Sequence, residues 1–200
     1  MPDFSYEKEA QNKGYKFVCG VDEAGRGPLA GPVCAAAVIL PDDCEIEGLN
    51  DSKKISEKKR ELLYDVIIEK AIAYSIAYGT LEEIEKYNIL EATYIAMNRA
   101  IEGLETNADF ALIDGNRVPK GISIPCETVV KGDSKSYSIA AASILAKVTR
   151  DRLMLEYDKK YPEYLFSSHK GYGTKAHYEA IKKHGVCEIH RLSFLKNVLG

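Results

Sequence analysis

The chain has 200 residues and a formal net charge of −3, which comes from 30 acidic and 27 basic side chains. Its hydrophobic share of 46% and charged share of 28% are typical of a soluble globular protein, and its length suits one domain over residues 1–200. No apolar run approaches the roughly 18 residues of a membrane span, and the polar first dozen residues exclude a signal or transit peptide, so we expect a cytoplasmic protein.

The first half of the chain alternates predicted strands with predicted helices. Short apolar runs predict strands over residues 17–21, 33–40 and 73–78. Ser56 is suited to cap a helix that continues to about residue 71. Thr80 and Glu83 form a capping box for a short helix, and Asn88 can cap the helix that follows.

The second half of the chain continues this alternation. Residues 108–113 and 128–130 predict two further strands, and residues 134–157 predict a long helix. The first half of that helix is alanine-rich and apolar nearly all round, so we expect it to be buried. Thr174 caps a last helix that ends at Gly185. Together these elements predict an α/β fold with a C-terminal helical part from about residue 160.

Acidic residues follow three of the predicted strands. Asp22 and Glu23 come directly after the first strand, Asp114 ends the fourth, and Asp133 lies at the start of the long helix. Open α/β sheets bind ligands outside the carboxyl ends of their strands, so we expect these four carboxylates to converge. Convergent carboxylates repel one another unless a cation lies between them. Oxygen ligands favour Mg²⁺ or Mn²⁺, and two such ions about 3.5–4 Å apart promote in-line displacement at phosphorus.

Each acid also has an ordinary structural explanation. Asp133 is suited to cap the following helix, and Asp114 before glycine and asparagine is suited to a turn. Asp22 and Glu23 are harder to explain in this way, because two adjacent acids after a core strand are costly without a partner. The three placements together favour a metal site.

The glycines of residues 25–31 are similar to a dinucleotide-binding loop. The third glycine is one place late, Pro28 removes a backbone donor, and Pro32 opens a β-like run instead of a helix. Since that loop requires a helix N-terminus for the pyrophosphate, we reject this interpretation.

The cysteines, histidines and basic clusters carry weaker signals. The five cysteines show no paired spacing, and Cys19 and Cys34 lie in apolar runs, so we expect reduced, buried thiols. No histidine is assigned a catalytic role. Basic residues cluster in three places: Lys53, Lys54, Lys58, Lys59 and Arg60; Lys131 and Lys135; and Lys147, Arg150 and Arg152. Such clusters are usually solvated helix faces and become informative only around an active site.

Six blocks of the sequence resemble the ribonuclease HII family. They are residues 20–33 (GVDEAGRGPLAGPV), 50–53 (NDSK), 113–116 (IDGN), 131–134 (KGDS), 140–148 (AAASILAKV) and 169–174 (HKGYGT). The blocks occur in the family's order and extend over residues 17–194. The first block begins near residue 20, which leaves no room for the additional N-terminal domain of ribonuclease HIII and favours type HII.

The resemblance implies a ribonuclease H-like fold with a mixed five-stranded sheet flanked by helices. It implies that Asp22, Glu23, Asp114 and Asp133 are the catalytic residues and hold two divalent ions, Mg²⁺ or Mn²⁺.

The resemblance also implies how substrate is bound. Gly25, Arg26 and Gly27 would read the ribose 2′-hydroxyl through their backbone, and Tyr172 would pack against the first deoxyribonucleotide after RNA. Lys53 would hold a phosphate. Lys147 and Arg150 either do likewise or pair with Asp151 and the acidic centre, and both alternatives stay open.

The implied activity is endonucleolytic hydrolysis of the RNA strand of RNA–DNA hybrids. The family also cuts 5′ of single ribonucleotides in duplex DNA, with 5′-phosphate and 3′-hydroxyl products. The expected partners are RNA–DNA hybrid and DNA that contains ribonucleotides, with no membrane partner, and the default oligomeric state is a monomer. Two rivals remain: another metal-dependent phosphotransferase or phosphatase, and a non-catalytic hybrid-binding module.

Overall fold

A mixed five-stranded sheet forms the centre of the protein. The computed structural model describes residues 1–196. The strands are β1 (Val18–Ala24), β2 (Val33–Ile39), β3 (Ala73–Gly79), β4 (Phe110–Asp114) and β5 (Cys126–Val129), in the order β3-β2-β1-β4-β5. The β1–β2 and β2–β3 pairs are antiparallel, and the β1–β4 and β4–β5 pairs are parallel. The expected α/β class and mixed sheet are therefore confirmed.

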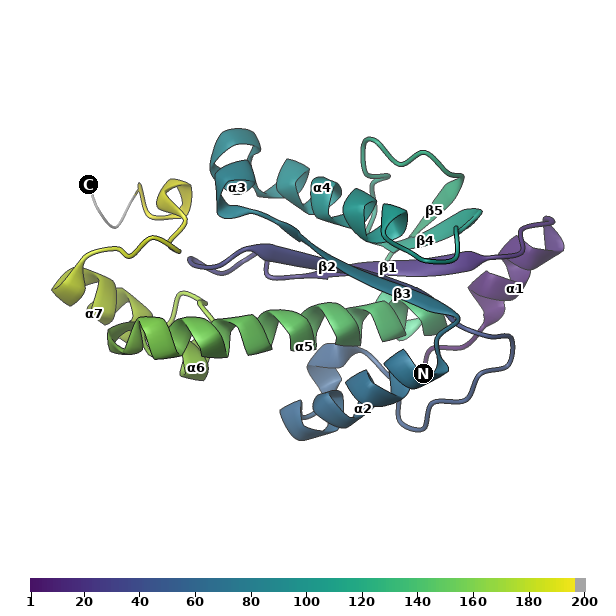
Figure 1. Cartoon of the computed structure of the whole chain (residues 1–200), viewed down its shortest axis with the longest axis horizontal. Coiled ribbons are helices and arrows are strands. Elements are labelled where there is room, and N and C mark those ends of the chain that lie inside the picture. The colour runs from purple at the N-terminus through teal and green to yellow at the C-terminus, as the bar shows by residue number, and fades with distance from the viewer. Residues whose placement is uncertain (197–200) are drawn as a thin grey trace.

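Helices cover both faces of the sheet. They are α1 (Ser5–Asn12), α2 (Glu57–Lys70), α3 (Leu81–Tyr87), α4 (Ile89–Glu102), α5 (Tyr137–Lys160), α6 (Phe166–His169) and α7 (Lys175–His184). The long α5 runs along one face with α2 outside it, and α3 and α4 lie over the other face (Figure 1). Within residues 1–196, no helix is long and apolar enough to cross a membrane.

The packing of α5 depends on small residues in the sheet. Alternate side chains of β2 point to opposite faces, so that Ala35 and Ala37 join the core beneath α4, whereas Ala36 joins the core beneath α5. A Cβ atom at Gly20 of β1 would lie 2.1 Å from the carbonyl carbon of Ser138 in α5. Only glycine permits this close approach, which buries the first half of α5 as the sequence predicts.

The capped helix starts are confirmed, whereas the long helix α5 begins at Tyr137, three residues later than predicted. Ser56 accepts a hydrogen bond from the Lys59 N–H, and Thr80 and Glu83 form the complete capping box. Asn88 accepts from two N–H groups of α4, although its backbone adopts φ 76°, in the left-handed region. The last helix begins after Thr174, whose hydroxyl accepts the His177 N–H.

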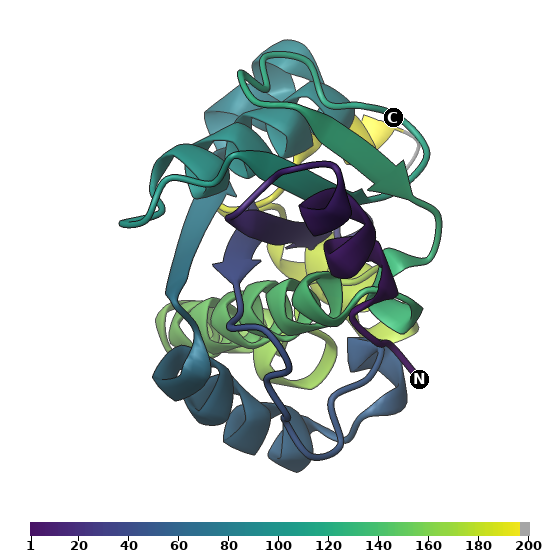
Figure 2. The ribbon, with the colours of Figure 1, turned by 90° about the vertical axis from the view of Figure 1, so that its right-hand side faces the viewer.

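An N-terminal helix, α1, was not predicted from the sequence. Its residues are mostly polar, and one buried acid attaches it to the rest of the fold. Glu7 Oε1 accepts hydrogen bonds from the Ser136 hydroxyl at 2.6 Å and from the Ser138 N–H at 2.9 Å. Figure 2 looks onto this end of the sheet, where α1 lies near the start of α5.

Candidate active site

The first two acids lie inside a strand, not after it. The predicted strand over residues 17–21 is too short, because β1 continues to Ala24 through its pairing with β2. Asp22 and Glu23 therefore point to opposite faces of the sheet. Asp22 is 5% exposed and lies on the α5 side, whereas Glu23 opens toward α4.

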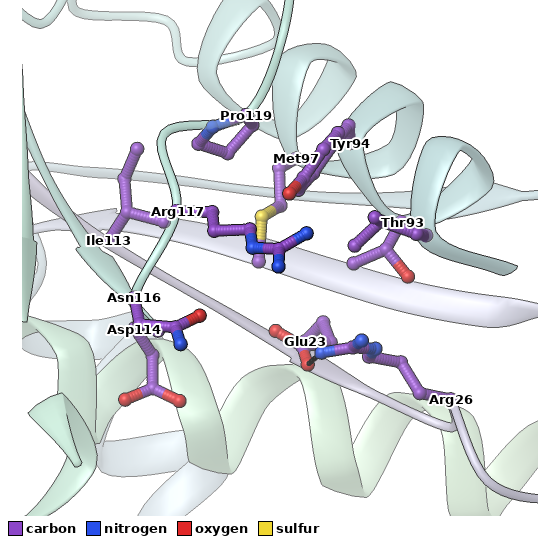
Figure 3. Close-up of a pocket in the computed structure, with 12 residues that line it drawn as sticks. Glu23, Arg26, Thr93, Tyr94, Met97, Ile113, Asp114, Asn116, Arg117 and Pro119 are labelled. Atoms are coloured by element: carbon purple, nitrogen blue, oxygen red, sulfur yellow. Dashed lines mark hydrogen bonds and ion pairs between the residues drawn. The ribbon is translucent and has the colours of Figure 1, made fainter. Parts of the chain in front are cut away.

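A pocket of about 240 Å³ lies between the end of β4 and helix α4. Glu23 and Asp114 both line it, together with Arg26, Tyr94 and Arg117. Figure 3 shows the Arg117 side chain extending into this space and the Arg26 guanidinium beside the Glu23 carboxylate. The nitrogen–oxygen distance of that ion pair is 3.4 Å.

A second pocket of about 220 Å³, here called the Gly25–Gly27 pocket, adjoins the first. Glu23 and Arg26 line both pockets, so the two spaces meet at the end of β1. Seven of the nine predicted site residues line the Gly25–Gly27 pocket: Asp22, Glu23, Gly25, Arg26, Gly27, Lys53 and Tyr172. Segments far apart in the chain therefore line these two neighbouring pockets, here together called the groove.

Tyr172 lies beside the Gly25–Gly27 loop. A Cβ atom at Gly27 would be 3.6 Å from the Tyr172 ring carbon Cε1. The tyrosine is 44% exposed, so it is not a core residue. Its carbonyl oxygen lies 2.9 Å from Nδ1 of buried His177, and the neighbouring Gly171 carbonyl accepts the Leu29 N–H at 2.8 Å. The Leu29–Gly171 bond joins the segment that carries Tyr172 to the segment that carries Gly25–Gly27.

Lys53 is presented by a short 3₁₀ helix, Ser52–Lys54. The Asp51 carboxylate caps this turn by accepting the Lys53 N–H at 2.9 Å. Ser143 of α5 donates a hydrogen bond of 2.7 Å to the Ser52 hydroxyl, which fixes the turn against the helix. The Lys53 side chain is 84% exposed, and its Nζ lies 4.0 Å from the Asp133 carboxylate.

Asp133 reaches the site on a turn instead of a strand end. The predicted strand over residues 128–130 is in fact β5, Cys126–Val129, and Asp133 lies four residues beyond it in the 3₁₀ helix Gly132–Ser134. Asp114 Oδ1 accepts the Gly132 N–H at 2.6 Å, which ties this turn to the end of β4. The alternative role of Asp133 as a helix cap is wrong, since Ser136 caps α5.

The electrostatics of the site penalise its negative charge. Burial raises the pKa of Asp22 well above its ordinary value, and the charges of Glu23 and Asp114 add to the effect. Burial also raises the pKa of Glu23, which Arg26 opposes and Asp114 reinforces. The pKa of Asp133 is raised by burial and then by the neighbouring Asp51 and Asp114. A bound cation would relieve all of these penalties at once.

The donor chemistry of the site fits Mg²⁺ or Mn²⁺. All four predicted ligands are carboxylates, the oxygen donors that these ions prefer. Within residues 1–196, no three acidic, histidine or cysteine side chains stand at the spacing of a shared ion. Glu23 is paired with Arg26, Asp133 lies near Lys53, and Asp114 holds the Gly132 N–H. A shared ion would therefore compete with these groups for the carboxylate oxygens.

Sequence reasoning missed three groups near the site. Asp51, within the NDSK block, adds a further negative charge beside Asp133. Arg117 directly follows the IDGN block and lines the pocket between the end of β4 and helix α4. Arg191 lies outside every block, yet its buried guanidinium donates to the Gly25 and Arg26 carbonyls, and only the tertiary structure reveals it.

Lys147 and Arg150 were each expected either to hold a phosphate or to pair with Asp151 and the acidic centre. The structure places the two side chains differently. Lys147 Nζ lies 2.7 Å from an Asp151 carboxylate oxygen and also lines the Gly25–Gly27 pocket. Arg150 takes neither predicted role, because it is buried and, within residues 1–196, donates only to backbone carbonyls. Its acceptors are the carbonyl oxygens of Ala30, Pro32 and Lys170.

Known proteins with similar sequences share one family. The family model described as Ribonuclease HII matches residues 19–197. A ribonuclease HII of Clostridioides difficile (strain 630) is 59% identical over 194 residues, 97% of this chain and 76% of that protein. One from Endomicrobium trichonymphae is 59% identical over 191 residues, 96% of this chain and 91% of that protein.

Solved structures agree with the sequence matches. The ribonuclease H2 from Pyrococcus horikoshii OT3 aligns with a TM-score of 0.75 and 28% identity, covering 89% of this chain and 93% of that one. Bst-RNase HIII in complex with Mn²⁺ shares the fold, with a TM-score of 0.72 at 18% identity over 95% of this chain and 71% of that one. With a family model that matches most of its length, this chain belongs to the ribonuclease HII family.

Proposed function

We propose that this chain is an endoribonuclease that hydrolyses the RNA strand of RNA–DNA hybrids and cuts 5′ of single ribonucleotides in duplex DNA. The products would carry 5′-phosphate and 3′-hydroxyl ends. The observation that carries the proposal is the meeting of Asp22 and Glu23 with the Gly25–Gly27 loop and Tyr172 in the Gly25–Gly27 pocket. Residues 1–200 form one catalytic domain. The protein acts as a monomer in the cytoplasm.

The four acids Asp22, Glu23, Asp114 and Asp133 would hold two divalent ions, Mg²⁺ or Mn²⁺. When bound, such ions supply an activated water and charge stabilisation at phosphorus. Two observations support this role: the carboxylate-only donor set and the raised pKa of the buried acids. Lys53 is exposed beside this centre, where its ammonium can hold a phosphate of the cut strand.

The part of the groove formed by Gly25–Gly27 and Tyr172 is suited to recognise the ribose. Only a 2′-hydroxyl distinguishes RNA from DNA at one nucleotide, and small residues let backbone N–H groups approach it. Gly25, Arg26 and Gly27 supply that backbone. The exposed ring of Tyr172, beside Gly27, supplies a flat surface for the sugar of the next deoxyribonucleotide.

The test is cleavage of a labelled DNA duplex with one ribonucleotide, in Mg²⁺, Mn²⁺ or EDTA. We expect metal-dependent cutting on the 5′ side of the ribonucleotide, no cutting of the identical all-DNA duplex, and loss of activity in Asp114→Asn. Cutting of the all-DNA duplex, or turnover of a small phosphate ester at a similar rate, would favour a general phosphotransferase. Binding without cleavage of this duplex or of a long hybrid, unaffected by Asp114→Asn, would favour a binding module.

A further inference from the structure

Two arginines are buried beneath the loop that lines the groove. Arg191 is 0% exposed and Arg150 is 1% exposed. Fully buried arginines are rare unless they are paired with acids. Here every hydrogen bond that the two guanidinium groups make within residues 1–196 goes to a backbone carbonyl oxygen. Their positions therefore need an explanation other than an ion pair.

Arg191 holds the glycine loop directly. Its Nε donates to the Gly31 carbonyl at 2.8 Å, and its two terminal nitrogens donate to the Arg26 carbonyl at 2.9 Å and the Gly25 carbonyl at 2.6 Å. Burial, and then the nearby charge of Arg150, lower the pKa of Arg191 to about 9. The guanidinium is still charged at neutral pH, so these are charge-assisted hydrogen bonds.

The direction of these carbonyls fixes the direction of the neighbouring N–H groups. In a planar trans peptide, the C=O and the following N–H point to opposite sides. With the Gly25 and Arg26 carbonyls turned inward to Arg191, the N–H groups of Arg26 and Gly27 face away from the core, toward the groove. Within residues 1–196, neither N–H donates to another backbone carbonyl. Two adjacent, unused donors therefore face the space where substrate would bind.

At Gly25 the same loop admits no side chain. Gly25 has φ 96°, in the left-handed region, and a Cβ atom there would lie 2.0 Å from Nε of Arg150. Arg150 itself bonds to the carbonyls of Ala30 and Pro32, later in the loop. Of the two arginines, only Arg191 contacts the carbonyls that orient the Arg26 and Gly27 donors.

We propose that Arg191 is a positioning residue that sets the ribonucleotide preference of the enzyme. It holds two peptide groups so that the Arg26 and Gly27 N–H groups form a rigid donor pair for the ribose 2′-hydroxyl. This inference rests on the proposed function, and it adds a residue outside the six sequence blocks. Lysine keeps the charge but has no planar fork, so it cannot hold three carbonyls in this arrangement.

The experiment measures binding in the inactive Asp22→Asn background, which prevents cleavage in Mg²⁺. Fluorescence anisotropy gives the dissociation constants of a duplex with one ribonucleotide and of the matched all-DNA duplex, and their ratio is the ribonucleotide preference. We expect Arg191→Lys to lower this preference about fivefold, which equals about 1 kcal/mol, and to leave the affinity for all-DNA duplex within about twofold.

Two controls separate positioning from general destabilisation. Ile67→Ala removes a fully buried side chain of α2 and lowers stability without touching the loop. Arg99→Lys changes a half-exposed arginine that pairs with Glu83. Both should keep the full preference. An unchanged preference in Arg191→Lys, or an equal fall in Ile67→Ala, overturns the inference.

If Arg191→Lys does not fold, a less disruptive variant at Phe194 tests the positioning role of Arg191. The Phe194 ring lies 5.2 Å from the Arg191 guanidinium carbon, so Phe194→Leu loosens the guanidinium and leaves its hydrogen-bond acceptors in place. A reduced preference supports the inference, and an unchanged one refutes it. If the Asp22→Asn parent itself shows no ribonucleotide preference, the proposed function fails instead, and the two failures are distinguished.

Discussion

Replacing Asp22 by asparagine is expected to abolish cleavage and, without metal, to make the protein more stable. Asp22 is buried and its carboxylate accepts a hydrogen bond from the Glu23 N–H at 2.7 Å. Asparagine is nearly isosteric and keeps this acceptor while it removes the charge. An uncompensated buried charge costs several kcal/mol, and the new amide donors need partners, so we expect a net gain of about 1–3 kcal/mol. In a chain of 200 residues this raises Tm by about 3–9 °C.

The pH dependence of folding stability shows whether the buried charge of Asp22 causes this difference. Because burial raises the pKa of Asp22, the folded parent holds its proton more tightly than the unfolded chain does. The parent is therefore most stable, with respect to this group, below the unfolded pKa, and loses that stability as pH rises through the folded pKa. The advantage of Asp22→Asn should be largest at neutral pH and shrink on acidification.

The assay is thermal unfolding followed by circular dichroism, in EDTA and in Mg²⁺. At ten times its dissociation constant Mg²⁺ should stabilise the parent by about 1.4 kcal/mol and the variant by less. Asp65→Asn, which changes an exposed acid of α2, is the control. It should change neither the stability in EDTA nor the stabilisation by Mg²⁺. A variant that is no more stable than the parent in EDTA at neutral pH would refute the electrostatic reasoning.

Three further outcomes follow from the site and its surroundings. Tyr172→Ala should reduce activity on a single embedded ribonucleotide more than Asp22→Asn reduces affinity for it; equal binding and cleavage by Tyr172→Ala and the parent would contradict this. Lys53→Ala should weaken duplex binding and lower the salt-dependence slope by about 1, as titrations at several salt concentrations will show. Burial lowers the pKa of His177 to about 4, below its unfolded value, so its contribution to stability is present above about pH 6.5 and is lost as pH falls toward 4. His177→Gln should flatten that part of the Tm–pH curve, and an unchanged slope would count against the assignment.

The sequence by itself determined several helix starts and the family of the chain. Caps at Ser56, Thr80 and Asn88 act within a few residues, so their side-chain chemistry was sufficient to place three helix starts. Buried thiols at Cys19 and Cys34 followed from apolar runs in the same way. The sequence blocks identified the family, because their order and spacing extend over nearly the whole chain.

Tertiary structure decided how the site is assembled. The extension of β1 through Asp22 and Glu23 depends on pairing with β2, and it sends the two acids to opposite faces. Asp133 depends on a turn that the Asp114 carboxylate holds at Gly132, 18 residues from Asp114 in the chain. Arg191 reaches a loop more than 150 residues earlier. Such contacts join groups that no local pattern connects, so only the folded chain defines them.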